Sequence, residues 1–359
     1  MNKWFLFLSI LLTSCSISNK QSDDKETCHL VSIEPILEGE EQEIPLNEWA
    51  KKIQFIPLET NDSVLLNEFI THIIYEQDKL VIQNKGEIYL FDTKGKFIRT
   101  IGSKGEGPEE YVSLGNLCAD ETGIHIDDTQ RSIKTYGWDG KWKETTPIPT
   151  NRNINEVLFL SDGRKVGYIQ NISGKAPMRM YIFCDTTVLG TIPYPKQFEP
   201  GKMRMVFYNE CYSFSTSSAD YMKEMFNDTI FQITEDHQLF PRWIINAGKY
   251  RLEEGARYRL KDPRNTLFKE KNAAQINIIG VYQNQLYLRA KLQDSSHFIC
   301  YNEKTGKATG LKLSYPKHDF AFNEEHTFIP RFISNNKRYL IGFEVQENDE
   351  NPVIILVER

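Results

Sequence analysis

The sequence predicts an all-β fold, a six-bladed β-propeller with four-stranded antiparallel blades, and three observations lead to this prediction. An aromatic–turn–Gly-Lys–aromatic pattern in "FDTKGKF" (91–97) returns 45 residues later in "YGWDGKW" (136–142), with a weaker copy in "YNEKTGK" (301–307). Turn residues between strand-like apolar runs occur near residues 78, 121, 162, 209, 284 and 336, a spacing of 40 to 52 except across one insertion. Short strands without helical spacing, in units of about 45 residues, are typical of propellers.

The second unit shows the expected four strands clearly. They are "LGNLCA" (114–119), "GIHID" (123–127), "SIKTYG" (132–137) and "WKETTPI" (142–148). Glycine and polar residues lie between these runs, and glycine reaches the positive φ angles that tight turns need.

The last unit offers one strand too few. It contains "TFIPRFIS" (327–334), "RYLIGFE" (338–344) and "PVIILVE" (352–358), whereas "KIQFIPLE" (52–59) has no hairpin partner of its own. We therefore expect the N-terminal strand to join the last blade, so that a strand near residue 55 pairs with one near residue 355. A ring closed in this way leaves no unpaired sheet edge between its first and last blades. The propeller is expected to cover residues 51–359, with a helical insertion near 247–273.

The first fourteen residues are expected to be a lipoprotein signal peptide. Lys3 gives a basic start, residues 4–12 are apolar but too short to span a bilayer, and small residues precede Cys15. This resembles a bacterial lipoprotein signal, whose cleavage leaves Cys15 lipidated; an ordinary signal peptide is the alternative. Residues 15–50 are then expected to be a lipid-anchored polar linker.

Composition limits the classes of partner. The chain has 359 residues, is 40% hydrophobic and carries a net charge of −6, or −7 once Lys3 leaves with the signal peptide. An acidic protein of this kind is not expected to bind nucleic acid. The five cysteines after Cys15 form no CxxC pair, and we expect mostly small buried hydrophobes with at most one or two disulfides. Membrane contact is expected through the lipid anchor alone.

Several stretches resemble a known group of proteins. The run "FDTKGKFIRTIGSKGEGPEEY" (91–111), "NDTIFQI" (227–233) and "IPLET" (56–60) are similar to the six-bladed β-propeller lipoproteins of the Bacteroidetes, relatives of NHL-repeat proteins. An acidic cluster at residues 23–26 resembles the export tag of surface lipoproteins in that phylum, although a plain solvated linker is an equal alternative. The resemblance implies this fold and an outer-membrane location, periplasmic or surface-exposed, but no assigned reaction.

A glycine-rich loop invites a phosphate-binding interpretation. Gly102, Gly105 and Gly107 are closely spaced, and such backbones can approach an anion. No Lys-Ser/Thr pair or helix start follows, however, and Pro108 removes a donor just before two glutamates. We therefore expect the loop to connect the outer strand of blade 1 to the inner strand of blade 2, where positive φ angles are needed.

Candidate ligand-binding residues are those on loops expected at the channel mouth, where propellers usually bind ligands. They are Tyr111, Asp127, Asp128, Arg131, Arg152, Arg204, Arg257, Tyr258 and Asp294. Arg257 and Tyr258 belong to the insertion, which has eight Lys and Arg against four Asp and Glu and a helix start at 262–263. The insertion is either a lid for an anionic or sugar-like ligand or a solvated helical cap.

Metal and catalytic motifs are weak. The seven histidines have no HExxH or HxH spacing, and no Gly-x-Ser-x-Gly occurs. Asp127 and Asp128 could supply calcium oxygens, but a β-turn between strands explains them more simply. We predict no catalytic residue and no cofactor, with a divalent metal such as calcium as the alternative.

The leading functional hypothesis is a binding or scaffolding module at the outer membrane, for a glycan, a peptide or a partner protein. Aromatic and arginine side chains at the channel mouth would supply stacking and bidentate contacts. The rival hypothesis is a metal-dependent hydrolase or lyase with its site at that mouth. A third is a sensory or assembly protein that acts through the blade edges.

Overall fold

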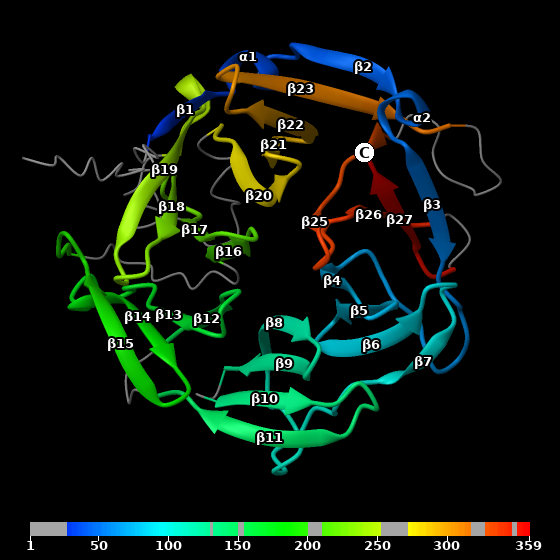
Figure 1. Ribbon diagram of the computed structural model, residues 1–359, viewed down its shortest axis with the longest axis vertical. Helices are drawn as coiled ribbons and strands as arrows, with labels where there is room; N and C mark the ends of the chain where they lie inside the picture. The colour runs from blue at the N-terminus through cyan, green and yellow to red at the C-terminus, as the bar shows by residue number, and fades with distance from the viewer. Residues whose placement is uncertain are drawn as a thin grey trace, which may run out of the picture.

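Six β-sheets surround a central axis in the computed structural model, which describes residues 27–129, 132–149, 154–199, 210–252, 272–316, 327–346 and 350–359 (Figure 1). Each sheet is a blade of four antiparallel strands, with its first strand nearest the axis (Figure 1). The chain is therefore a six-bladed β-propeller, as the repeats predict. Among the described residues, no helix is both long and apolar enough to cross a membrane.

The first three blades follow one another along the chain. Blade 1 contains β4 (Ile70–Glu76), β5 (Lys79–Asn84), β6 (Glu87–Asp92) and β7 (Phe97–Thr100). Blade 2 contains β8 (Leu114–Asp120), β9 (Gly123–Asp128), β10 (Ser132–Tyr136) and β11 (Trp142–Pro147). Blade 3 contains β12 (Glu156–Phe159), β13 (Lys165–Tyr168), β14 (Met178–Cys184) and β15 (Thr187–Pro193). The four strands of blade 2 match the predicted runs to within a few residues.

The last three blades also use segments from elsewhere in the chain. Blade 4 contains β16 (Cys211–Ser215), β17 (Asp220–Glu224), β18 (Thr229–Ile233) and β19 (Leu239–Asn246). Blade 5 contains β20 (Gln275–Tyr282), β21 (Gln285–Leu292), β22 (Ser295–Asn302) and β23 (Lys307–Ser314), and β24 (Thr327–Phe328) pairs with β23. Blade 6 contains β25 (Phe332–Ile333), β26 (Leu340–Glu344), β27 (Val353–Glu358) and β3 (Lys52–Pro57).

Blade 6 takes its outer strand from the N-terminal part of the chain. β3 pairs antiparallel with β27, and Phe55 lies opposite Ile355. The pairing joins the two ends of the propeller sequence in one sheet, which is the arrangement expected from the missing strand of the last unit.

The repeated Gly-Lys pattern forms the turns between third and fourth strands. Gly95, Gly140 and Gly306 have φ angles of 82°, 78° and 65°. At Gly95, a side chain would also collide with the backbone carbonyl of Pro57, because a Cβ there would lie 2.0 Å from that oxygen. The pattern is therefore a turn signature, since only glycine adopts this conformation without strain.

The core lies in the joints between neighbouring blades. Consecutive residues of a strand point to opposite faces, so each inner strand serves two joints. In β5, Leu80 and Ile82 pack in the cluster shared with blade 6, whereas Val81 packs in the cluster shared with blade 2. This explains why β5 is apolar on both faces and shows no alternation with polar residues.

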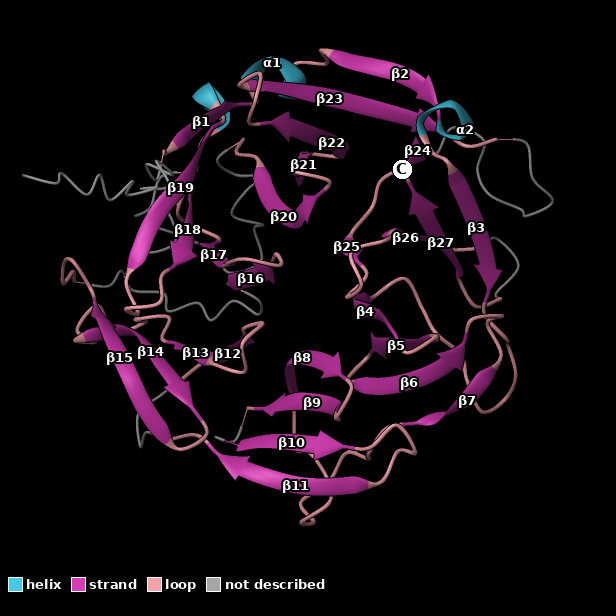
Figure 2. Ribbon diagram, viewed as in Figure 1, coloured by secondary structure: helices cyan, strands magenta, loops and turns pink. Residues whose placement is uncertain are grey.

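Residues 29–49 form an N-terminal strap outside the ring. β1 (His29–Ser32) pairs parallel with β19, and β2 (Glu41–Pro45) pairs parallel with β23. The short helices α1 (Glu34–Leu37) and α2 (Leu46–Trp49) connect these strands around the outside of blades 4 to 6 (Figure 2). The strap therefore adds a fifth strand to blade 4 and another outer strand to blade 5.

The strap differs from the polar linker expected over residues 15–50. Val31, Ile33 and Leu46 are completely buried, with charged residues between them. Apolar residues separated by polar ones suit a segment with one buried side, and the acidic composition of this region concealed that pattern. The signal peptide, Cys15 and residues up to 26 lie outside the described residues.

Residues 247–273, predicted as a helical insertion, are described only in part. A 3₁₀ turn, η1 (Gly248–Tyr250), follows β19, and residues 253–271 lie outside the described residues. Arg257 and Tyr258 fall in that range.

All five cysteines after Cys15 are free. Cys28 is exposed, Cys118 and Cys184 are half-buried, and Cys211 and Cys300 are buried. Burial raises the pKa of the Cys118, Cys211 and Cys300 thiols, so these groups are held neutral.

Candidate functional site

The two ends of the ring differ in the loops that they carry. The connections between blades and the turns between second and third strands emerge at one end of the ring, which we call the upper face. The opposite end is the lower face. All nine candidate ligand residues were predicted for the upper face. Four of them are described: Tyr111, Asp127, Asp128 and Asp294. Arg131, Arg152, Arg204, Arg257 and Tyr258 lie outside the described residues.

Tyr111 is buried in the joint between blades 1 and 2, with 1% of its surface exposed. Its backbone N–H donates to the Ser103 carbonyl at 3.0 Å, and its own carbonyl accepts from Gly105 at 3.0 Å. Burial raises the pKa of the phenol. In the structure, Tyr111 braces the glycine-rich loop.

The aspartates at the end of β9 are also buried and accept backbone hydrogen bonds. Asp127 Oδ2 accepts the N–H of Val157 at 3.0 Å, across the joint to blade 3. Asp128 Oδ1 accepts the N–H groups of Val112 and Ser113 at 3.2 and 3.3 Å. Burial, together with the charges of Glu156 and Asp128, raises the pKa of Asp127 to about 7. Both aspartates thus fasten the start of a neighbouring segment to blade 2.

Asp294 is exposed in the turn between β21 and β22. No group of three or more His, Cys, Asp or Glu side chains suited to a metal ion occurs in the part of the chain that the structure describes.

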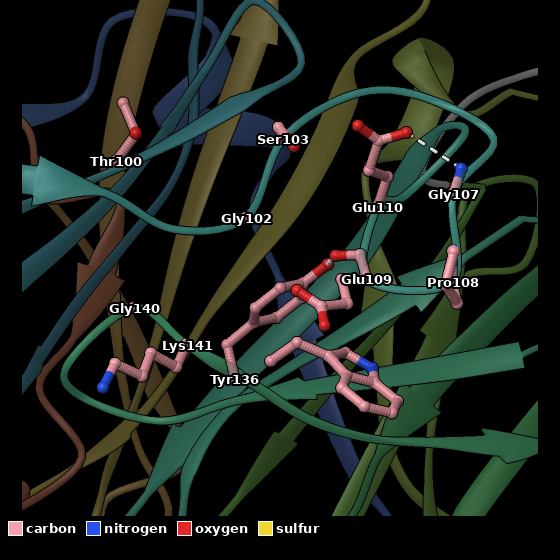
Figure 3. A pocket seen from close by; sticks show the side chains of 11 residues that line it. Thr100, Gly102, Ser103, Gly107, Pro108, Glu109, Glu110, Tyr136, Gly140 and Lys141 are labelled. Atoms are coloured by element: carbon pink, nitrogen blue, oxygen red, sulfur yellow. Dashed lines mark hydrogen bonds between the residues drawn. The ribbon is translucent and has the colours of Figure 1, made fainter.

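The glycine-rich loop borders an open cleft of about 730 Å³ between blades 1 and 2 (Figure 3). Glu110 Oε2 accepts the N–H of Gly107 at 2.8 Å, and Gly105 N–H donates to the Tyr111 carbonyl. Figure 3 shows the Glu110 carboxylate held over the loop by this bond. Two of the three glycine amides are therefore used within the loop, and a carboxylate of the chain itself lies beside them.

Packing also explains the first glycine of this loop. Gly102 has a φ of 62°, and a Cβ there would lie 2.7 Å from the ring of Tyr136. The Tyr136 hydroxyl donates to the Glu109 carbonyl at 2.8 Å. The loop thus folds closely over a buried ring, which agrees with the expected crossing between blades.

A different set of polar residues meets near the axis at the upper face. We call this set the axial arginine site: Tyr212, Asn277, Arg289 and Arg331. Tyr212 is on β16, Asn277 is on β20 and Arg289 lies opposite Asn277 on β21. Arg331 immediately precedes β25, where its N–H donates to the Ile341 carbonyl at 2.8 Å. The site therefore spans blades 4, 5 and 6.

An apolar floor holds these elements in place. A Cβ on Gly280 of β20 would lie 2.9 Å from Ile333 and 3.8 Å from Phe214. Phe214 is two residues after Tyr212, and Ile333 is two residues after Arg331, so each pair shares one face of its strand. Because the inner strands all run from the upper to the lower face, the polar residues form a layer directly above the floor.

The two arginines reach the axis from neighbouring joints. Arg289 shares a face of β21 with Tyr287, which packs in the cluster between blades 5 and 6. The Arg331 guanidinium lies over the ring of Phe343, which packs in the cluster between blades 6 and 1. The neighbours of Gly280, Phe214 and Ile333, bring the inner strands of blades 4, 5 and 6 together just below these side chains.

Two polar atoms of this site lack a partner among the described residues. The donor Arg289 Nε is buried without a hydrogen-bond partner, and so is the acceptor Asn277 Oδ1. Arg331 places its guanidinium carbon 4.1 Å from the centroid of the Phe343 ring. Among the described residues, neither arginine forms an ion pair, and Tyr212 forms no side-chain hydrogen bond. A permanent charge without a counterion is costly to bury.

Electrostatics reflect this absence of partners. Burial lowers the pKa of Arg289, and the Tyr212 phenol opposes the shift. Although part of the Arg331 side chain is exposed, burial of its guanidinium, followed by the charge of Arg289, lowers its pKa to about 10. Glu344 and Tyr315 oppose this lowering, so acidic groups of the chain offset the charge of Arg331 only in part.

Two acids close to Tyr212 are already engaged. Glu156 accepts the N–H groups of Glu210 and Cys211 at 2.8 and 3.1 Å, and also the Gln170 amide at 3.0 Å. Tyr168 donates its hydroxyl to Glu210 at 3.0 Å. These carboxylates hold blades 3 and 4 together and do not pair with the arginines.

Sequence reasoning missed the axial arginine site. It searched the loops for ligand residues, whereas Tyr212 and Arg289 lie within strands and Arg331 directly precedes one. A usable signal was present in "LYLRAKL" (286–292), where an arginine stands among apolar residues in a strand that should be buried on both faces.

The fold and the site together define an all-β propeller with two arginines that form no ion pair among the described residues at one end of its axis. The family comparison is more specific: residues 31–358 match the model of the family described as "Domain of unknown function (DUF4934)", and the chain belongs to that family. No curated protein matches the chain.

Solved structures agree on the fold. A "Putative exported protein" from Bacteroides fragilis is 12% identical, with a TM-score of 0.61 over 93% of this chain and 100% of its own. A protein of unknown function from Bacteroides thetaiotaomicron is 12% identical, with a TM-score of 0.48 over 86% of this chain and 76% of its own. At this identity, the first likeness shows a shared architecture alone, and the second carries no argument.

Proposed function

We propose that this protein is an exported binding module, tethered by lipid at Cys15, that holds a ligand or partner at its upper face. The observation that carries the proposal is the axial arginine site, where the buried Nε of Arg289 has no hydrogen-bond partner among the described residues and the exposed Arg331 forms no ion pair with them. Groups left unpaired in a folded protein are costly, and they are common where a ligand supplies the missing partner.

The geometry suits the binding of a ligand without catalysis. Arg289 and Arg331 are permanent cations that bind acceptors but do not transfer protons. Glu156 and Glu344, two described acids whose charges reach this site, accept backbone or side-chain hydrogen bonds. The arrangement therefore supports recognition of a glycan, a peptide or a protein partner.

Export and tethering rest on the sequence. The apolar stretch at 4–12 and the small residues before Cys15 support a lipoprotein signal, and the likeness to a protein named as exported is consistent with it. Replacing Cys15 with alanine is expected to release the protein from the outer-membrane fraction. If Cys15→Ala stays with that membrane after a high-salt wash, tethering by lipid is wrong.

A ligand screen tests the binding proposal directly. Purified full-length protein in detergent is heated with polysaccharides, peptides or divalent ions, and its melting temperature is recorded. A ligand that prefers the native state raises that temperature. Glu106→Ala, on the exposed glycine-rich loop, serves as a control and should keep the response, whereas Arg331→Met should reduce it. If no compound protects the wild type, or if Arg331→Met responds fully, binding at the upper face is not supported.

A further inference from the structure

The axial arginine site also indicates what kind of group the ligand carries. This inference rests on the proposed binding function and adds the chemistry of recognition. Arg289 and Arg331 approach the axis from blades 5 and 6, Tyr212 adds a hydroxyl from blade 4, and all three can donate hydrogen bonds. A guanidinium is planar and offers parallel N–H groups that match the oxygens of carboxylate or phosphate.

We propose that the axial arginine site binds an oxyanion, the carboxylate or phosphate group of a ligand, between Arg289, Arg331 and the Tyr212 hydroxyl. One oxyanion would accept from both guanidinium groups and remove their mutual repulsion. The floor of Phe214 and Ile333 limits access from below, so the anion approaches from the upper face.

The described residues provide no ion pair that would replace such an anion. Glu344 is the acid on the strand next to Arg331, and it accepts the Tyr315 hydroxyl at 2.7 Å. Arg331 lies over the Phe343 ring and forms no ion pair among the described residues. An oxyanion would complete the coordination that these side chains leave open.

Thermal stability distinguishes two possible roles of Arg289. If Arg289 stabilises the fold, replacing it lowers the melting temperature. If its charge is compensated only by a bound anion, replacing it in the absence of that anion raises the melting temperature. Arg289→Met keeps the length of the aliphatic stem and removes the guanidinium. We expect Arg289→Met to melt at a higher temperature than the wild type in chloride buffer.

Binding is measured with simple anions on the full-length protein in detergent. Sodium phosphate, sodium acetate and D-galacturonate are each compared with sodium chloride at the same ionic strength and pH 7. Phosphate also stabilises proteins by exclusion from their surface, and Arg289→Met and Arg331→Met correct for that general effect. We expect phosphate or galacturonate to raise the melting temperature of the wild type by about 3 °C more than that of either substituted protein.

Two variants and one control locate the response. Arg289→Met and Arg331→Met should each lose the anion-dependent rise in melting temperature. Each should also bind the anion at least about 10-fold more weakly in a calorimetric titration, because each variant lacks about one charge-assisted hydrogen bond. Arg338→Gln, an exposed arginine at the lower face, should retain the rise. A response to phosphate alone assigns a phosphoryl group, and one to acetate or galacturonate assigns a carboxylate.

Two results would overturn the inference. One is a wild type whose melting temperature is the same in every anion as in chloride. The other is an Arg289→Met variant that responds as the wild type does or is less stable in chloride. If the ligand screen still finds a protecting glycan or peptide in either case, the binding function stands without the oxyanion.

Discussion

Arg164 at the lower face and Arg289 at the upper face are both arginines, but their hydrogen-bond and ion-pair partners differ. Arg164 Nε lies 2.6 Å from Asp162, and its other nitrogens approach Asp220, the Thr234 carbonyl and His237. Arg289 has a buried Nε with no partner. Arg164 therefore has ion-pair partners at the lower face, whereas Arg289 has none among the described residues of the upper face.

The same contrast extends to other ionisable groups. At the lower face, the buried Asp220 accepts the Ser161 N–H at 2.9 Å and the Ser215 hydroxyl. At the upper face, burial raises the pKa of Asp127 to about 7 and lowers that of Lys223 to about 8. Asp127 and Lys223 are therefore two upper-face groups whose charged forms burial disfavours, and Lys337 is a lower-face group of the same kind.

The largest expected effect tests the lower face. Asp220→Ala leaves the Ser161 N–H without its acceptor and removes a carboxylate from the surroundings of Arg164. Breaking a buried ionic contact of this kind costs about 4 kcal/mol of folding free energy. Urea unfolding followed by tryptophan fluorescence measures it. A loss below about 1 kcal/mol would mean that the lower face is not held by these contacts.

The next effect depends on pH and tests the upper face. The pKa of Asp127 is raised in the folded state, so its contribution to stability is complete below about pH 4 and is lost as pH rises through about 7. Asp127→Asn has no such loss. Between pH 4 and pH 8, the free energy of unfolding should shift in favour of the variant by on the order of 3 kcal/mol.

Unfolding curves at a series of pH values check this shift, and Asp162→Asn at the lower face is the control. Carboxyl NMR should also show one aspartate that titrates near pH 7 and disappears in Asp127→Asn. Parallel pH curves for Asp127→Asn and the wild type would contradict the prediction.

A third effect comes from Lys223, which is 2% exposed and donates only to the Glu224 carbonyl, at 3.0 Å. Burial lowers the pKa of Lys223 to about 8, so below that pH the folded state carries a disfavoured charge. Lys223→Met should gain about 2 kcal/mol of stability at pH 7. The gain should shrink as pH rises from 8 to 10.5, because the wild-type lysine becomes neutral. A less stable Lys223→Met at pH 7 would refute this account.

The smallest effect is expected at an exposed lower-face pair. Arg338 and Glu358 lie 3.2 Å apart, and more than half of the Arg338 side chain is exposed. Solvent screens such pairs, so Arg338→Gln should melt within error of the wild type. A clear loss of stability would show that exposed pairs also hold the lower face and would weaken the contrast with the upper face.

Sequence reasoning succeeded where the signal was local and repeated. Gly95 and Gly140 mark equivalent turns because each blade needs the same positive φ angle. It failed for the strap, where Val31 and Leu46 are buried by blades more than two hundred residues away along the chain. It also did not foresee that Tyr111, Asp127 and Asp128, selected as loop residues at the mouth, are buried and bonded within the protein.

By itself, the sequence determined the blade, its turns and the number of repeats, because alternation and glycine turns depend on neighbours a few residues apart. Only the tertiary structure decided which charges go unpaired. Tyr212, Arg289 and Arg331 come near one another because three blades converge on one axis. No local pattern records that Arg164 finds carboxylates at the lower face while Arg289 finds none among the described residues of the upper face.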